Sequence, residues 1–385
     1  MSSLSTNTPS TTTTSADPDT GAATEEEEGN IFSKYYSQLS HQQNMLTDHV
    51  RTKTYQQAFF KNTVDFQGAN CLDVGTGSGI LAFFCVQAGA KEVWGVEMSR
   101  ITIAAKKLVS SNGLSSKIHI VKGKMEEVTL PIKVDVIVSE PLGFLLVHER
   151  MLESYITGRD RYLKPGGKMF PSNSTIYTAP FTDEPLYAET CQKSDFWCNN
   201  DFMGVDLTAL HETSMEEAFG QPVVGYFHPD ILLSDDRGTH FVDFHTVTHE
   251  ALKSFEIDFQ HTITKTAVCH GIACWFDCDF SGSQETVVLK TGPEAPGTHW
   301  YQCRLMFRSP LAVNKGQILN GRLTFRANDS FSYDVKVEAG IDCNPRIETE
   351  NMVFLQDQHY HYLYAEESAV DAQGMGHVRG NEGQV

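Results

Sequence analysis

The spacing of hydrophobic positions divides this chain into two halves with different predicted structure. In residues 70–170, short apolar runs alternate with helical segments, as they do in a doubly wound α/β sheet. Ahead of these runs, residues 31–62 predict a pair of helices. The runs typical of buried parallel strands are residues 70–74, 92–96, 118–121 and 134–138.

After Pro171 the pattern changes to short β-rich segments with turn residues between them, which favours an antiparallel barrel or sandwich. Residues 184–220 are an exception, because they mix helix and loop and carry exposed-looking aromatic side chains at Phe196, Trp197, Phe202 and Phe219. An inserted arm with surface aromatics and a small core beneath a loop both fit this pattern. The predicted strands include residues 175–179, 241–244, 255–259, 287–289, 323–325 and 334–337.

A length of 385 residues exceeds one ordinary hydrophobic core, so we expect two domains. The Ser/Thr-rich start lacks the basic and apolar regions of a secretory signal and ends in four glutamates, which predicts a disordered tail. The predicted division is a tail at 1–29, an α/β domain at 30–170, a β-domain at 171–340 and a polar tail at 341–385.

Composition narrows the classes of protein to which the chain can belong. With 40% hydrophobic and 21% charged residues it is globular, and no apolar run is long enough to cross a membrane. A net charge of −19 argues against direct nucleic-acid binding and suits basic protein partners. None of the nine cysteines forms a C-x-x-C pair, and Cys269, Cys274 and Cys278 lie in an apolar strand pattern. We therefore expect buried free thiols in a reducing compartment, and no metal site.

A glycine-rich turn at residues 75–79 follows the first strand and precedes an apolar helix, which is the setting of a nucleotide-binding turn. Its G-x-G-x-G spacing lacks the last glycine of a dinucleotide site, so it favours a nucleoside without phosphate, such as S-adenosylmethionine. Glu97 ends the second strand, where an acid binds ribose hydroxyls. Glu126 follows the third strand; it is a candidate for the adenine amino group or a glutamate that faces solvent.

Glu140 ends the fourth strand, where open α/β sheets place their ligands, and Glu149 returns nine positions later across a loop. Two carboxylates at one site suit a planar guanidinium. A helix cap plus a surface charge would explain the same two residues. Asp48 and Arg51 lie three residues apart, which places them on one helix face. A surface ion pair would explain this spacing equally well.

Four motifs in order resemble the type I protein arginine methyltransferases: LDVGTGSGIL, VWGVEMS, SEPLGFLLVHERMLES and GTHWYQ. SHQQNM, VRTKTYQ, DFMGVDLTAL and HGIACWFDCDF are similar to the coactivator-associated (histone-arginine) group of that family. The resemblance covers residues 32–339. It implies a Rossmann-like class I S-adenosylmethionine-dependent methyltransferase domain, then an antiparallel β-barrel with a helical dimerisation arm at 184–220. It also implies a homodimer in nucleus and cytoplasm that forms mono- and asymmetric dimethylarginine in histones or other regulatory proteins.

The resemblance also assigns roles to residues. Asp48 and His299 are implied to form a hydrogen-bonded pair that joins the N-terminal helix to the barrel, and are counted with Glu140 and Glu149 as catalytic. Met151 and Trp300 join the two glutamates as substrate contacts, and Met45 and Met151 crowd the methyl-transfer space. The implied cofactor-binding residues are Tyr36, Gln42, Met45, Arg51, Gly75, Gly77, Glu97, Glu126 and Ser154.

Two positions depart from the family pattern. The lid motif of the family reads Tyr-Phe-x-x-Tyr. Here residues 32–36 keep its second tyrosine as Tyr36 but lack its first tyrosine and its phenylalanine, unless a shift of one residue aligns Phe32 and Tyr35 with the motif. His148 stands before Glu149, where close relatives carry Asn. Two other functions remain open: a small-molecule methyltransferase with the same cofactor domain, and a non-catalytic binding module with a methyltransferase fold.

Overall fold

The computed structural model describes residues 31–342 and 347–361, excluding the side chain of Ile31. The predicted tail at 1–29 lies outside the described residues. So do residues 343–346 and 362–385 of the predicted tail at 341–385. Residues 347–361 correct that prediction, because they form β15 (Ile347–Phe354), η6 (Leu355–Asp357) and β16 (His359–Tyr360). Thr349 and Val353 face the core from β15, so one side of this largely polar segment is buried.

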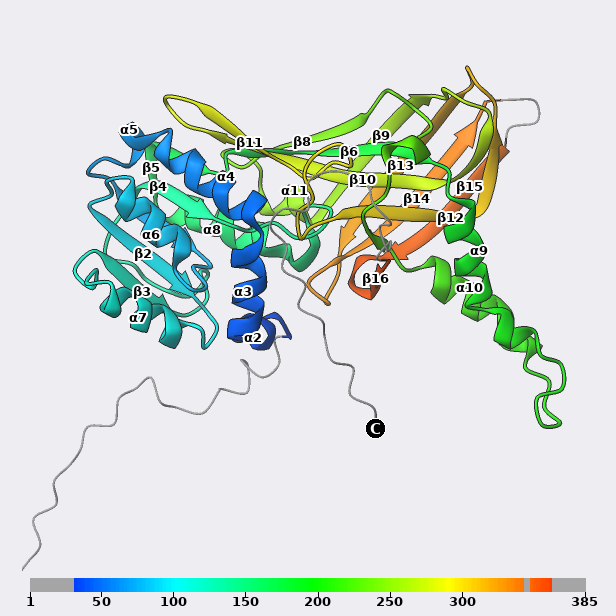
Figure 1. The fold of residues 1–385 in the computed structure, drawn as a ribbon, viewed down its shortest axis with the longest axis horizontal. Helices are drawn as coiled ribbons and strands as arrows, with labels where there is room; N and C mark the ends of the chain where they lie inside the picture. Colours follow the sequence, from blue (N-terminus) through cyan, green and yellow to red (C-terminus); the bar gives the residue numbers. More distant parts are fainter. Residues whose placement is uncertain (1–30, 343–346, 362–385) are drawn as a thin grey trace, which may run out of the picture.

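The N-terminal part is a five-stranded parallel sheet in the order β3-β2-β1-β4-β5 (Figure 1), which confirms the predicted α/β class of this domain. Its strands are β1 (Asn70–Val74), β2 (Glu92–Glu97), β3 (Ile118–Lys122), β4 (Val134–Ser139) and β5 (Leu163–Phe170). β1 pairs with both β2 and β4, so the strand order reverses there and leaves a crevice at the carboxyl ends of these strands.

The helices of this part are α2 (Ile31–Tyr36), α3 (Leu39–Thr47), α4 (His49–Phe60), α5 (Thr63–Phe66), α6 (Ile80–Gln87), α7 (Thr102–Ser111), η2 (His148–Arg150) and α8 (Met151–Tyr162). β1 and β4 are buried along almost their whole length, which explains their continuous apolar sequence. α6 likewise buries Leu81, Ala82, Phe84 and Cys85. The sheet and its helices therefore form a core from which the polar strand ends emerge.

The C-terminal part consists of two antiparallel sheets, in the orders β16-β7-β12-β10-β6-β8, with β11 on β10, and β15-β14-β13-β9. The two sheets come together where β8 lies beside β9 and β12 beside β15, which confirms the predicted antiparallel architecture. One pairing differs, because β16 is parallel to β7. The elements are β6 (Asn173–Phe181), β7 (Val223–Gly225), η5 (Pro229–Ile231), β8 (Gly238–Asp243), α11 (His249–Lys253), β9 (Ser254–Thr262), β10 (Ala267–Ser281), β11 (Thr286–Lys290), β12 (Gln302–Val313), β13 (Ile318–Ala327) and β14 (Tyr333–Ile341).

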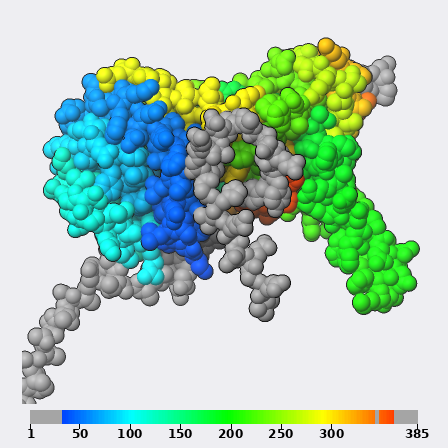
Figure 2. All heavy atoms as spheres, in the orientation of Figure 1, coloured from blue at the N-terminus to red at the C-terminus, as the bar shows by residue number. Residues whose placement is uncertain are grey.

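Residues 184–220 project from this β-domain as a separate arm, green in Figures 1 and 2. The arm contains α9 (Glu184–Gln192), η3 (Asp195–Cys198), η4 (Thr208–Leu210) and α10 (His211–Phe219). Phe196 and Phe202 are exposed and Trp197 is half-buried, whereas Phe219 is fully buried. The expectation of an exposed aromatic therefore fails at Phe219, because α10 returns to the barrel there and packs Phe219 in a second core with Leu186.

The two parts are joined by a buried asparagine at the end of α4. Asn62 donates through Nδ2 to the carbonyl oxygens of Ala58 and Glu285, both at 2.9 Å. Its Oδ1 accepts from the backbone N–H groups of Gln284, at 2.9 Å, and Glu285, at 2.8 Å. The hairpin formed by β10 and β11 is thereby fixed to the helix that carries Arg51.

Candidate active site

A cavity of about 560 Å³ lies at the carboxyl ends of β1, β2 and β4, beneath α2 and α3. This is the end of a doubly wound sheet at which ligands bind. Most of the residues predicted for the site come together there, although they extend in sequence from Tyr36 to Ser154. The lining includes Tyr36, Gln42, Met45, Arg51, Gly75, Gly77, Glu97, Glu126, Glu140, Glu149, Met151 and Ser154.

The glycine-rich turn between β1 and α6 forms one wall. Gly75 and Gly77 both have positive φ, 68° and 54°. A Cβ at Gly75 would lie 2.0 Å from the terminal methyl of Met151, and one at Gly77 would lie 2.9 Å from Oε1 of Gln42. Gln42 Oε1 also accepts from the backbone N–H of Ser78 at 3.1 Å. The positive φ angles favour glycine at both positions, and the missing Cβ atoms leave room for the ends of the Met151 and Gln42 side chains.

Glu97 stands at the end of β2 with its carboxylate fixed by backbone. Oε2 accepts from the N–H of Gly77 at 3.0 Å, and Oε1 accepts from the N–H of Ser99 at 2.7 Å. A carboxylate has about four acceptor sites, so two remain for a ligand. Further along the wall, Ser154 Oγ donates to Glu126 Oε1 at 2.7 Å.

Arg51 and Glu140 form an ion pair at the base of the cavity, with 2.8 Å between Nη2 and Oε2. Nη1 of Arg51 donates to the carbonyl oxygen of Met45 at 3.2 Å, while its buried Nε has no hydrogen-bond partner among the described residues. Burial alone would lower the pKa of Arg51, but the Glu140 carboxylate outweighs it and raises this pKa. The guanidinium is therefore held charged.

Glu149 accepts from the hydroxyl of Tyr36 through both oxygens, at 3.0 and 2.9 Å. Burial raises the pKa of Glu149 to about 7; the bond from Tyr36 opposes this shift, and the charge of Glu140 adds to it. The carboxyl group therefore titrates near neutral pH, which is a common property of groups at functional sites. Tyr36 meets Glu149, whereas Tyr35 is exposed and stacks on His41, so the alignment without a shift fits the structure.

Asp48, His299 and Trp300 do not line the cavity. Asp48 caps α4 by accepting from the N–H of Arg51 at 2.9 Å, and its Oδ2 accepts from the backbone N–H and Nδ1 of His299, at 2.9 and 2.8 Å. Burial opposes ionisation of Asp48, but these bonds prevail and lower its pKa. The pair thus joins the N-terminal helices to the barrel.

Trp300 was predicted to contact substrate, but its side chain is only 3% exposed. Its Nε1 donates to the carbonyl oxygen of Leu142 at 2.6 Å, so it supports the loop between Glu140 and Glu149 from beneath. Sequence reasoning also missed Phe331, which lines the cavity from the loop after β13. No local pattern could reveal it, because it lies 182 residues from Glu149.

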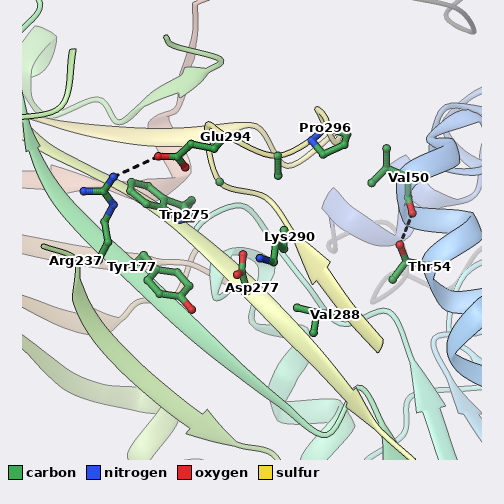
Figure 3. Close-up of a pocket in the computed structure, with 12 residues that line it drawn as sticks. Val50, Thr54, Tyr177, Arg237, Trp275, Asp277, Val288, Lys290, Glu294 and Pro296 are labelled. Atoms are coloured by element: carbon green, nitrogen blue, oxygen red, sulfur yellow. Dashed lines mark hydrogen bonds and ion pairs between the residues drawn. The ribbon is translucent and has the colours of Figure 1, made fainter. Parts of the chain in front are cut away.

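A second cavity, of about 570 Å³, lies between α4 and the hairpin of β10 and β11 (Figure 3). Arg237 pairs with Glu294 at 3.3 Å and stacks on Trp275, with 5.5 Å between its Cζ and the ring centroid. None of the residues predicted for the site lines this cavity. The chemistry expected from the sequence therefore belongs to the first cavity.

Two of the predicted absences can be compared with the described part of the chain. Across residues 31–342 and 347–361, no cluster of three or more His, Cys, Asp or Glu side chains is arranged to hold a metal ion. Within the same ranges, every helix is too short or too polar to span a membrane. The cysteines described there are free thiols, and Cys269, Cys274 and Cys278 are buried.

Comparison with known proteins gives the same two-part division. Residues 172–341 match the arginine methyltransferase oligomerization subdomain, and residues 48–171 match the ribosomal protein L11 methyltransferase (PrmA) family. The chain is 45% identical over 342 residues to the histone-arginine methyltransferase CARMER of Drosophila willistoni. That alignment covers 89% of this chain and 64% of the relative, so the chain spans less than two thirds of that protein.

Two solved structures are similar over nearly their full length. Arabidopsis thaliana protein arginine methyltransferase 10 has a TM-score of 0.78 at 30% identity, covering 84% of this chain and 99% of that one. The Trypanosoma brucei PRMT1 enzyme–prozyme heterotetrameric complex with AdoHcy has a TM-score of 0.74 at 30% identity, covering 83% and 99%. The fold, the geometry of the site and the similarity to these proteins together show that the chain belongs to the protein arginine methyltransferase family.

Proposed function

We propose that this protein transfers methyl groups from S-adenosylmethionine to the guanidinium nitrogens of arginine in proteins, forming mono- and asymmetric dimethylarginine. The main support is that Glu140 and Glu149 line one cavity together with the glycine-rich turn and Glu97. A site for a guanidinium thus adjoins a site for a nucleoside. Histones are the proposed substrate class, since the fruit-fly relative is named a histone-arginine methyltransferase.

The residues present fit S-adenosylmethionine. Glu97 keeps free acceptor sites for two ribose hydroxyls, and a Cβ at Gly75 or Gly77 would clash with the side chains that close over the turn. Arg51 retains a buried Nε donor for the carboxylate of the methionyl group. Tyr36, Gln42, Met45, Glu126 and Ser154 complete the proposed cofactor surface.

When bound, the cofactor supplies an electrophilic methyl on a sulfonium. The protein must aim one guanidinium nitrogen at it and hold positive charge on the others. Removing a proton from arginine beforehand would cost roughly 9 kcal/mol at pH 7, because the pKa of a guanidinium lies far above neutral pH. We infer that Glu140 and Glu149 bind the remaining nitrogens as carboxylates, and that the proton leaves during or after transfer.

The remaining assignments follow from the same proposal. Asp48 and His299 keep α4 against the barrel, and Trp300 positions the loop that carries the glutamates. Met45 and Met151 narrow the space for methyl transfer, which favours asymmetric over symmetric product. Residues 30–170 are proposed as the cofactor-binding domain, which also carries Glu140 and Glu149, and residues 171–340 as the β-barrel substrate domain that supports it. The proposed locations are nucleus and cytoplasm.

Glu149→Gln tests the role of the glutamate pair. Transfer of labelled methyl to an arginine peptide should fall at least a thousandfold, whereas the affinity for S-adenosylhomocysteine, measured by calorimetry, should change less than threefold. Glu217→Gln, at an exposed position on the arm, is the matched control. Near-wild-type turnover by Glu149→Gln would refute the assignment, and only symmetric dimethylarginine in the product would refute the asymmetric one. Cofactor binding by the wild-type protein without turnover on any arginine peptide would favour a binding module.

The proposed homodimer forms through the arm at 184–220. The tip of the arm exposes Met203, 90% exposed, next to Phe202 and Val205. Met203→Asp combined with Val205→Asp should shift the sedimentation coefficient from dimer to monomer, while Phe241→Asp, also exposed but on β8, should not. A dimer that survives the double change would refute this interface.

A further inference from the structure

The backbone that carries Glu149 has a conformation that needs external support. Glu149 and Arg150 both have left-handed backbone, with φ of 71° and 55°. Such residues are strained and persist only where the surrounding contacts hold them in place. The position of the Glu149 carboxylate therefore depends on whatever holds its two neighbours.

Both neighbours are held by the same loop of the β-domain. Nδ1 of His148 lies 2.9 Å from Oγ of Ser332, and Nη1 of Arg150 donates to the carbonyl oxygen of Asn328 at 2.8 Å. We name residues 328–332, between β13 and β14, the support loop. Glu149 stands between two hydrogen-bonded anchors on this loop, although about 180 residues separate them in sequence.

The support loop has its own internal hydrogen bonds, organised by Asn328. Oδ1 of Asn328 accepts from the backbone N–H groups of Ser330, at 3.0 Å, and Ser332, at 3.1 Å. Its Nδ2 donates to Asp334 at 2.8 Å and to Gln356 at 2.9 Å. The loop is therefore held together by hydrogen bonds that do not involve the Glu149 turn.

Aromatic rings pack around the His148 side chain and hold it in its hydrogen bond with Ser332. It is buried, with its ring 4.3 Å from Phe144 and 6.0 Å from Phe32, centroid to centroid. Burial lowers the pKa of His148 to about 4, so the imidazole is neutral at pH 7. One ring nitrogen of a neutral imidazole donates and the other accepts, and the Ser332 hydroxyl can complement Nδ1 in either role.

We propose that the support loop positions Glu149 for the substrate guanidinium, with His148 and Arg150 as the positioning residues. The inference rests on the proposed function, since it concerns how firmly the site grips arginine. The position of the Glu149 carboxylate is then set by the β-domain. His148, the departure from the family pattern, then acts through Ser332 without touching substrate.

Ser332→Ala removes the partner of His148 and adds no bulk. We expect kcat/KM for an arginine peptide to fall about five- to tenfold, with KM for S-adenosylmethionine unchanged within twofold. Ser330→Ala is the matched control, because it changes a serine of the same loop whose described contact is through its backbone N–H. His148→Asn should retain more than half of the activity, since the Asn side-chain amide carries a polar atom at the same distance from Cβ as Nδ1. His148→Ala should lose as much as Ser332→Ala, and the two losses should not add.

A second readout is independent of activity. In protein labelled with ¹⁵N-histidine, Ser332→Ala should shift the Nδ1 resonance of His148, identified by its absence from His148→Asn, and Ser330→Ala should not. An unchanged Nδ1 resonance, or equal cofactor and peptide effects in the kinetics, would overturn the proposal. If the wild-type protein proved inactive on arginine peptides, the proposed function would fail, and with it the role for Glu149. The resonance would then report only whether the anchor exists.

Discussion

Replacing Glu149 by glutamine should stabilise the folded protein at alkaline pH while it abolishes the proposed activity. The reason is that this carboxyl group is buried next to Glu140, and its pKa rises from 4.5 to about 7 on folding. A group whose pKa is raised in the folded state binds its proton more tightly there than in the unfolded chain. Folding is therefore penalised wherever the group must lose that proton.

The sign and the pH window follow from these two values. Below pH 4.5 the glutamate is protonated in both states and contributes no penalty. The penalty grows between pH 4.5 and 7 and is complete above pH 7, where it reaches roughly 3 kcal/mol at 1.36 kcal/mol per pH unit. The glutamine is neutral at every pH and can still accept from Tyr36. Because its bond from Tyr36 is weaker than one to a carboxylate, we expect a gain of about 1–3 kcal/mol at pH 8.

Urea-induced unfolding followed by tryptophan fluorescence at pH 5 and pH 8 checks this prediction. Glu149→Gln should unfold at a higher urea concentration than wild type at pH 8, and the difference should shrink towards zero at pH 5. Glu217→Gln should show no such dependence on pH. A stability difference that is absent at pH 8, or equal at both pH values, would refute the argument that burial controls this group.

Three further predictions concern the pH profile, the cofactor site and the junction between the two parts. Because Glu149 must be ionised to bind a guanidinium, kcat/KM for an arginine peptide should rise with pH up to about 7 and level off above it, and a profile already flat from pH 5 would contradict this. Arg51→Lys keeps the charge but loses the planar fork that reaches Glu140 and Met45, so calorimetry should show S-adenosylhomocysteine binding at least tenfold more weakly. Asn62→Ala removes four hydrogen bonds in a fully buried place and should destabilise the protein by about 2–4 kcal/mol in urea, whereas Lys61→Ala, which breaks only the exposed pair with Glu285, should cost about 0.5 kcal/mol or less.

The sequence determined the features that depend on local pattern. The continuous apolar runs of β1 and β4 predicted a parallel sheet, because strands covered on both faces have no polar side. The glycine spacing at residues 75–79 predicted the tight turn, Glu97 was placed by the strand it ends, and Glu140 by the strand it directly follows. Short β-rich segments between turn residues likewise predicted the antiparallel half, and the alternation of strand and helix predicted a doubly wound sheet, although the order of its strands came only from the structure.

Tertiary structure decided what depends on contacts between distant residues. It buried Trp300 beneath the loop of the glutamates, buried Phe219 at the base of the arm, and ordered residues 347–361 against β14 and β7. It also brought Ser332 to His148 and Tyr36 to Glu149. These pairings join side chains more than 110 residues apart, and the pKa of a carboxyl group depends on such neighbours and on the water they exclude. Hydrophobic periodicity records only which face of an element is buried, and not what it is buried against.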